Sequence, residues 1–127
     1  MISEIKTDKI APIAVPLTHV IRAGDFVYVS GQIPVRPDGT KVIGDFREEV
    51  RASLNNISAA VEAAGGTLAD VCKANVYLQN AQLFNTMNEV YREYFTEPFP
   101  ARVTVIAPIS DPDIRIEIDA IAYIPAS

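Results

Sequence analysis

The 127-residue sequence contains one cysteine, one histidine and no tryptophan. Cys72 has no second cysteine with which to form an intramolecular disulfide. His19 stands alone as well, so any metal or catalytic site that requires two imidazoles is excluded, and neither residue lies in the spacing typical of a zinc site. We therefore expect no metal site, and we expect His19 to be a solvated residue of a hairpin.

Motifs for phosphate binding and for a serine nucleophile are absent too. Neither G-x-G-x-x-G nor a P-loop occurs, and the pair Gly65-Gly66 follows a helical pattern instead. Ser30, in "VSGQIP", lacks the G-x-S-x-G context of a nucleophile elbow. Gly31 beside it is better explained by a bulge or by the close approach of a ligand.

Long apolar runs and an excess of positive charge are missing. No run approaches the ~20 residues needed to cross a bilayer, and charged side chains interrupt the first twenty residues, where a signal peptide would have its apolar core. We therefore expect a cytoplasmic protein with no membrane contact. The formal net charge of −5 disfavours nucleic acid as a partner, although a small cationic pocket can exist within such a field.

The composition that is present is typical of a folded protein, with 49% hydrophobic and 21% charged residues. A chain of this length can bury about two thirds of the surface that its unfolded form exposes. No repeat, low-complexity segment or change of composition marks a linker. We predict a single domain spanning residues 1–127.

Apolar spacing predicts two helices among several strands. A helix is expected from Phe46 to Ala64, ending at Gly65-Gly66, and a second one over residues 81–95 with Asn80 as its cap. A hairpin is expected within residues 19–35, and further strands at 70–78, 102–106 and 114–123. This order predicts an α+β fold in which the two helices cover one face of a mixed sheet.

Strand alternation also predicts which side chains share a sheet face. In the strand at 70–78, we expect Cys72 on the same face as the apolar residues Ala74, Val76 and Leu78. In the last strand, one face carries Ile114, Ile116, Ile118 and Ala120, and the other carries Arg115, Glu117 and Asp119. If Val103 and Val105 face the helices, Arg102 and Thr104 lie on the same side of the sheet as Glu117. Such a partly charged, partly apolar face suits a subunit interface that contains a polar pocket.

Arg102 begins the β-branched run of "FPARVTVIA" (99–107), where a charged side chain is costly to bury. A guanidinium in a partly dry site holds a carboxylate through two parallel hydrogen bonds, so a carboxylate is its natural ligand. Glu117 would be a base or a water-positioning group if it shared that pocket. The alternative, which the spacing supports equally, is that Arg102 pairs with Glu117 or Asp119 across the sheet and that Glu117 is structural.

Several segments, in order along nearly the whole chain, share one resemblance. They are "YVSGQIPV" (28–35), "VEAAGGTLADVCKANVYL" (61–78), "FNTMNEVYREYF" (84–95), "FPARVTV" (99–105) and "IRIEIDAIAY" (114–123). Together they resemble the RidA/YjgF family of small enamine and imine deaminases. The resemblance implies a chorismate-mutase-like α+β fold, assembled as a homotrimer with clefts between the subunits.

The resemblance also implies roles for individual residues. Arg102 would hold the substrate carboxylate, and Glu117 would help to place the attacking water. Gly31, Phe84 and Asn88 would line the cleft. Two positions depart from the best-known members of the family: Leu17 stands where those carry a cleft tyrosine, and Thr104 stands where many carry a cysteine.

The activity implied by the resemblance is hydrolysis of reactive 2-imino acids, or of their enamine tautomers, to 2-oxo acids and ammonia, without a cofactor. One alternative is a deaminase dedicated to a larger unsaturated amino acid, which Leu17 makes credible. A second is a non-catalytic, carboxylate-binding regulatory trimer. Binding or cleavage of RNA is the least favoured, because the net charge is negative and no basic or aromatic stripe is present.

Overall fold

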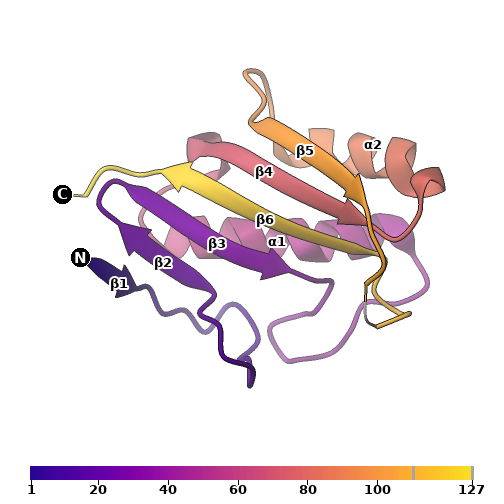
Figure 1. Ribbon diagram of the computed structural model, residues 1–127, viewed down its shortest axis with the longest axis horizontal. Helices are drawn as coiled ribbons and strands as arrows, with labels where there is room; N and C mark the ends of the chain where they lie inside the picture. The colour runs from indigo at the N-terminus through magenta and orange to yellow at the C-terminus, as the bar shows by residue number, and fades with distance from the viewer. Residues whose placement is uncertain (110, 127) are drawn as a thin grey trace.

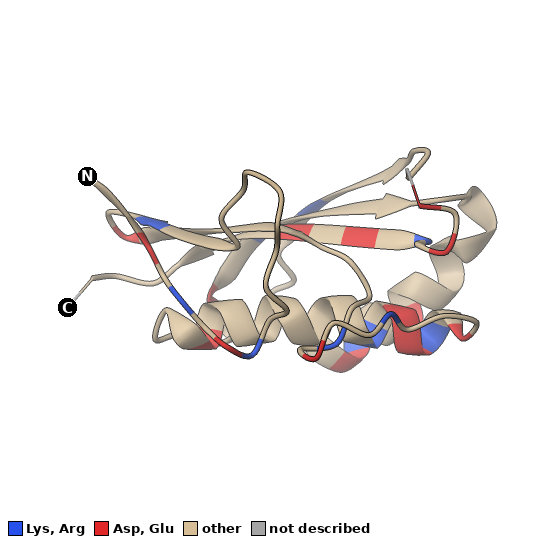
Figure 2. Cartoon of the chain, turned by 90° about the horizontal axis from the view of Figure 1, so that it is seen from below, with Lys and Arg blue, Asp and Glu red and all other residues tan. Residues whose placement is uncertain are grey.

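A six-stranded sheet with two helices packed on one of its faces makes up the computed structural model, which describes residues 1–109 and 111–126 (Figures 1 and 2). The strands are β1 (Ile2–Glu4), β2 (Val20–Ala23), β3 (Phe26–Gln32), β4 (Val71–Leu78), β5 (Ala101–Ile106) and β6 (Ile116–Tyr123). The helices are α1 (Phe46–Ala63) and α2 (Phe84–Tyr94). The predicted α+β fold class is confirmed.

The strands run in the order β1-β2-β3-β6-β4-β5. β4 and β5 form a parallel pair, and the other neighbours are antiparallel. Parallel neighbours need a crossover connection, and here α2 forms part of it. α1 packs under β3 and β6, whereas α2 lies toward the β5 edge (Figure 1). This arrangement sets α2 beside the strand that carries Arg102.

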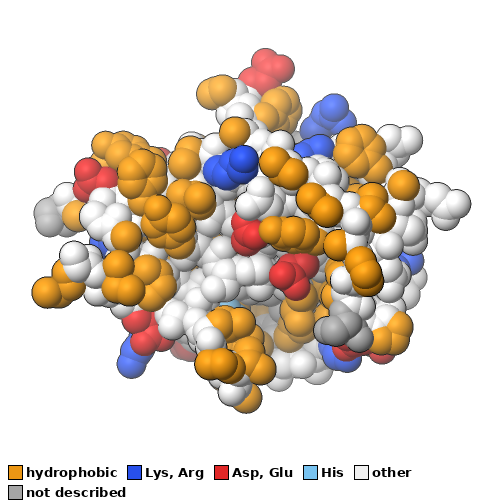
Figure 3. Space-filling view, viewed as in Figure 1, with side chains coloured by type: hydrophobic (Ala, Val, Ile, Leu, Met, Phe, Trp, Pro, Cys, Tyr) orange, Lys and Arg blue, Asp and Glu red, His pale blue; other side chains and the backbone are white. Residues whose placement is uncertain are grey.

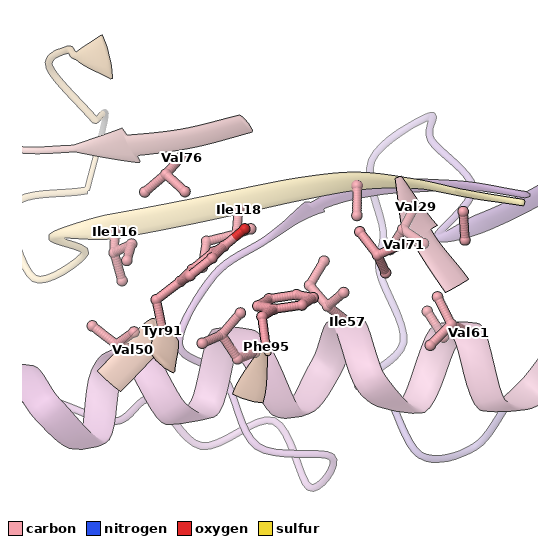
Figure 4. Packing of buried hydrophobic residues seen from close by; sticks show 14 of the residues in the cluster. Val29, Val50, Ile57, Val61, Val71, Val76, Tyr91, Phe95, Ile116 and Ile118 are labelled. Carbon is pink, nitrogen blue, oxygen red and sulfur yellow. The ribbon is translucent and has the colours of Figure 1, made fainter. Parts of the chain in front are cut away.

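α1 begins and ends where the sequence predicts. The side chain of Asp45 caps it by accepting a hydrogen bond from the backbone N–H of Glu48 at 3.3 Å. Its last turn is closed by Gly65, whose φ of 93° is readily adopted only by a residue without a side chain. The helix buries one apolar side against the sheet (Figure 4), formed by Val50, Leu54, Ile57, Ala60 and Val61.

Three local features differ from the sequence prediction. The second helix is shorter than expected, because Asn80 caps a separate 3₁₀ turn at Ala81–Leu83 that precedes α2. The strand β1 was not predicted, and all three of its residues are exposed. Cys72 was expected on the face of Ala74, but a register shift at the start of β4 leaves Cys72 exposed and buries Val71 instead.

The orientation expected for β5 is wrong. Arg102 pairs in register with Ala74, which is fully buried under the helices, and Val103 pairs with Asn75. Paired residues of neighbouring strands point to the same side of a sheet, so Arg102 faces the helices and Val103 faces away from them. Val103 and Val105 are exposed by 46% and 39%. Because β5 lies at the edge of the sheet, the alternation of its residues alone did not reveal which face is covered.

Arg115 also departs from expectation, because it does not join Glu117 on the open face. Its guanidinium forms a two-pronged ion pair with Glu49 of α1, whose side chain is fully buried. Arg115 lies just before the first residue of β6, where strand alternation no longer applies. The pair ties α1 to the start of the strand that carries Glu117.

Glu49→Gln tests the contribution of this ion pair. The variant loses charge-assisted hydrogen bonds to Arg115, so we expect its free energy of unfolding to fall by about 1.5–3 kcal/mol in urea denaturation. Glu93→Gln is the matched control, because Glu93 also forms a two-pronged pair with an arginine, Arg51, but at the surface. A much smaller loss is expected there. Equal losses in both variants would contradict the structural importance given to Glu49.

Candidate functional site

A pocket of about 260 Å³ lies between α2 and the start of β5. It is lined by Asn88, Tyr91, Arg92, Phe99, Pro100 and Arg102. Two of these, Asn88 and Arg102, are among the residues predicted for the site. Phe84, a third, contributes its ring to the surroundings of the Arg102 guanidinium, with 5.9 Å between Cζ and the ring centroid.

Arg102 has no anionic partner in the part of the chain that the structure describes. None of the ion pairs among residues 1–109 and 111–126 includes it. Its Cζ lies 4.9 Å from the centroid of the Tyr91 ring, and its one side-chain hydrogen-bond contact is the weak acceptor Met87 Sδ at 4.0 Å. The alternative in which Arg102 pairs with Glu117 or Asp119 is therefore excluded within one chain. Its guanidinium can bind an external anion.

A second pocket, of about 330 Å³, adjoins Glu117 near the end of β3. Leu17 and Gly31 line it together with Glu117, so three more of the predicted residues lie together. The remaining lining is mostly aliphatic and consists of Ile10, Ala11, Pro12, Ile13, His19, Gln32, Ile33, Val35 and Asn56. This pocket combines one carboxyl group with an apolar wall.

Gly31 allows the carboxyl group of Glu117 to occupy its position. A Cβ atom at residue 31 would lie 2.3 Å from Glu117 Oε2 and 2.8 Å from Cδ, distances that require one of the groups to move. The register of β3 against β6 shifts between Val29 and Gln32, which is the bulge expected around this glycine. Burial raises the pKa of Glu117, and the neighbouring charge of Asp119 raises it further.

His19 is not the solvated residue that the sequence suggested. Its Nε2 lies 2.9 Å from the carbonyl oxygen of Ala11, and its Nδ1 lies 3.0 Å from the side-chain nitrogen of Gln32. Nε2–H donates to Ala11, and Nδ1 accepts from Gln32, an arrangement that requires the ring proton on Nε2. His19 thereby fastens the segment around Ala11, which forms one wall of the second pocket.

Asp119 lies beside Glu117 in a small polar network on the open face. It accepts hydrogen bonds from Asn75 Nδ2 at 2.8 Å and from the Tyr77 hydroxyl at 3.2 Å. Burial, followed by the charge of Asp119, raises the pKa of Tyr77. Sequence reasoning did not single out Asn75 or Tyr77, although their alternation with Ala74 and Val76 placed them on this face.

The predicted site residues thus fall into two groups on opposite faces of the sheet. Arg102, Asn88 and Phe84 lie on the helix side. Leu17, Gly31 and Glu117 surround the other pocket, and Glu117 alternates with the buried Ile116 and Ile118, so it points away from the helices. Thr104 is half-buried on the helix side of β5 and lines neither pocket. A single chain therefore does not bring Arg102 and Glu117 to one substrate.

The sheet face opposite the helices is largely apolar. Figure 3 shows hydrophobic side chains gathered there around acidic groups and a hollow. The exposed apolar residues on its strands are Ile2, Phe26, Tyr28, Val103, Val105 and Tyr123, each exposed by 39–65%. Faces of this kind on small proteins mark interaction surfaces. The subunit interface that the sequence predicts on this side of the sheet stays a prediction.

No side-chain cluster in the described residues suits a metal ion. Within residues 1–109 and 111–126, no group of three or more His, Cys, Asp or Glu side chains is arranged to hold one. None of the helices that the structure describes is long and apolar enough to span a bilayer.

Comparison with known proteins finds relatives over almost the whole chain. The family described as Endoribonuclease L-PSP matches residues 7–124. A RutC family protein of Pyrococcus horikoshii is 47% identical over 109 residues, which cover 85% of this chain and 86% of the relative. The 2-iminobutanoate/2-iminopropanoate deaminase of Escherichia coli is 40% identical over 116 residues, covering 88% and 91%. The crystal structure of E. coli TdcF with bound serine superimposes with a TM-score of 0.89 at 34% identity, covering 95% of this chain and 98% of that one.

Glu117→Gln tests whether the surroundings of Glu117 resist its ionisation. A carboxyl group whose pKa is raised on folding costs stability only where the unfolded chain is ionised, so the cost is absent at low pH and grows as pH rises through the raised pKa. We expect the variant to gain stability relative to the wild type on going from about pH 4 to about pH 7 in urea denaturation. The exposed Glu62, changed to Gln, controls for the loss of a charge. A difference between Glu117→Gln and wild type that is independent of pH would contradict the assignment.

Proposed function

Because the chain belongs to the RidA/YjgF family, the family described as Endoribonuclease L-PSP, we propose that it hydrolyses 2-imino acids, or their enamine tautomers, to 2-oxo acids and ammonia. The observation that carries the proposal is the guanidinium of Arg102 at the wall of a pocket, which has no anionic partner among the described residues. The name of the E. coli relative, 2-iminobutanoate/2-iminopropanoate deaminase, supports the reaction class.

Arg102 binds the substrate carboxylate in this proposal. A planar guanidinium can make two parallel charge-assisted hydrogen bonds to a carboxylate, which fixes the orientation of the ligand as well as its position. The bound serine in the structure of TdcF supports a ligand of this kind, because an amino acid carries a carboxylate. Asn88 and Phe84, next to Arg102, complete this half of the site.

The complete site is proposed to form between subunits of a homotrimer. Arg102 and Glu117 lie on opposite faces of one sheet, so a substrate that touches both must lie between two chains. Each cleft takes Arg102 from one subunit and Glu117, with Gly31 and Leu17, from its neighbour. Assembly also buries the exposed apolar sheet face, which is the driving force for association.

In the chemical step, a water molecule attacks the imine carbon. Arg102 holds the adjacent carboxylate and draws electron density from that carbon, while Glu117 aligns the water and accepts its proton. The protonated Glu117 passes this proton to the imine nitrogen, which gives a carbinolamine with an amino group. Glu117 then takes the proton of the new hydroxyl group and delivers it to that nitrogen, so the carbon–nitrogen bond breaks and ammonia leaves as the carbonyl of the 2-oxo acid forms. A raised pKa suits Glu117 to this exchange, because the group then binds a proton more readily near neutral pH. None of these steps calls for a cofactor.

A larger substrate is the second candidate, and the wall of the Glu117 pocket favours it. Leu17 lies there with Ile13 and Ile33 and supplies no phenol. On this wall of the pocket, a side chain of the substrate would therefore make only aliphatic contacts. This favours imino acids with extended apolar side chains over the smallest ones. The two candidates share one mechanism and differ in the preferred side chain.

Arg102→Lys tests the role of Arg102. Lysine keeps the charge but replaces the fork with a single flexible ammonium, so we expect kcat/KM for imine hydrolysis to fall by about 10- to 100-fold while the thermal melt is retained. The substrates are imino acids generated in situ by an amino-acid oxidase. Arg47→Lys, at an exposed ion pair with Glu89, is the matched control and should stay close to the wild type.

Full activity in folded Arg102→Lys would refute the assigned role of Arg102. A wild-type protein that binds a carboxylate but hydrolyses none of the imino acids would favour the non-catalytic, carboxylate-binding alternative. Binding of RNA that weakens with salt would instead revive the nucleic-acid alternative that the net charge disfavours.

A further inference from the structure

We propose that Tyr91 is a positioning residue that holds the Arg102 guanidinium on the face of its ring, leaving the N–H donors available to a ligand. This inference rests on the proposed function, because it concerns how Arg102 is prepared to bind a carboxylate. It assigns a task to a residue that sequence reasoning treated only as part of an amphipathic helix.

The geometry places an aromatic platform under the guanidinium. Phe84, Met87 and Tyr91 are spaced three and four residues apart, so α2 presents them on one face. Arg102 Cζ lies 4.9 Å from the Tyr91 centroid, 5.9 Å from that of Phe84, and its guanidinium contacts Met87 Sδ. Both ring distances are within the range of a cation–π interaction, and the Tyr91 ring is the closer.

The Tyr91 ring is itself held in place, as a positioning residue requires. Its side chain is 3% exposed, and its centroid lies 4.6 Å from that of Phe95. Figure 4 shows both rings between α1 and the sheet among the buried side chains of the core. Phe84, by contrast, is 41% exposed. The rigid contact to Arg102 is therefore the one from Tyr91.

A ring face holds a guanidinium without using the groups that bind a ligand. An aspartate or glutamate in the same place would accept hydrogen bonds from two of the N–H groups and neutralise the positive charge. Fewer N–H donors and less positive charge would then be available to bind a substrate. The ring attracts the cation through its π electrons and accepts no hydrogen bond from the N–H groups at the edge of the guanidinium. Arg102 is therefore oriented, and no carboxylate among the described residues occupies its N–H donors.

The Tyr91 hydroxyl takes no part in this arrangement. It is buried, and it has no hydrogen-bond partner among the described residues. Figure 4 shows its oxygen close to Ile118, beneath the sheet. Phenylalanine at this position would keep the ring and remove an unsatisfied polar group, so the proposal requires Tyr91→Phe to resemble the wild type.

The test compares removal of the Tyr91 ring with removal of the Tyr91 hydroxyl alone. Tyr91→Leu removes the ring, Tyr91→Phe keeps it, and Phe46→Leu is the matched control. Phe46 lies under a different guanidinium, that of Arg115 at 5.3 Å, which already pairs with Glu49. The control thus removes a ring beneath an arginine that lines neither pocket.

The first readout is made on the ligand-free protein by NMR. A proton above an aromatic ring is shielded by the ring current, so the Arg102 Nε–H resonance should move downfield in Tyr91→Leu and stay in place in Tyr91→Phe and Phe46→Leu. Arg102→Lys identifies the resonance by its disappearance. An unmoved resonance in folded Tyr91→Leu would overturn the proposal whether or not the protein is an enzyme.

The second readout is binding of 2-oxobutanoate, followed by calorimetry, together with KM and kcat for the corresponding imino acid. We expect Tyr91→Leu to weaken binding and raise KM by about 10-fold with a smaller change in kcat, and the other two variants to stay within about 2-fold. Thermal melts separate this effect from loss of the fold. If Tyr91→Phe lost as much affinity as Tyr91→Leu, the hydroxyl would be responsible and the proposal would be wrong. Absence of turnover in the wild type would refute the proposed function, and the resonance comparison would still decide the role of Tyr91.

Discussion

The alternation of side chains along β5 and β6 places Arg102 and Glu117 on opposite faces of the sheet. Arg102 shares the buried side of the sheet with Ala74, and Glu117 lies between buried isoleucines and points the other way. A one-residue change in either strand would reverse this relation. Because the sheet separates the two groups, chemistry that needs both of them needs two chains. The apolar face beside Glu117 offers a surface for the second chain.

The fold places the positive charge of Arg102 against aromatic rings, and no carboxylate among the described residues neutralises it. A half-buried guanidinium with no anionic partner among the described residues costs free energy, and the rings of α2 offset part of that cost through cation–π attraction of about 0.5–2 kcal/mol. In the proposed function, the remainder is recovered when the substrate carboxylate binds. Glu49 and Arg115 show the other solution within the same molecule, in which carboxylate and guanidinium satisfy each other and the pair serves the fold. The contrast is between Arg115, which is paired within the fold, and Arg102, which we propose binds a ligand.

The sequence predicted the helices and strands better than it predicted how they pack against one another. The 3.6-residue period of α1 and its flanking Asp45 and Gly65 are local signals, so the bounds of the helix could be predicted. The face occupied by Arg102 could not, because an edge strand with β-branched residues at 103 and 105 is compatible with either orientation. Tyr91 was indistinguishable from other apolar positions of α2, since its partner Arg102 lies on a strand whose placement depends on the tertiary fold. His19 was misjudged for the same reason, because Ala11 and Gln32 reach it only in the folded chain.

Complementation between two inactive variants tests whether each site takes Arg102 and Glu117 from different chains. Arg102→Ala and Glu117→Gln, each inactive alone, are mixed in equal amounts, unfolded and refolded together, and assayed for imine hydrolysis. If the two residues come from neighbouring subunits, random assembly restores both to about a quarter of the sites, and about a quarter of wild-type activity returns. If both come from one chain, every site lacks one of them and the mixture stays inactive, which would contradict the account.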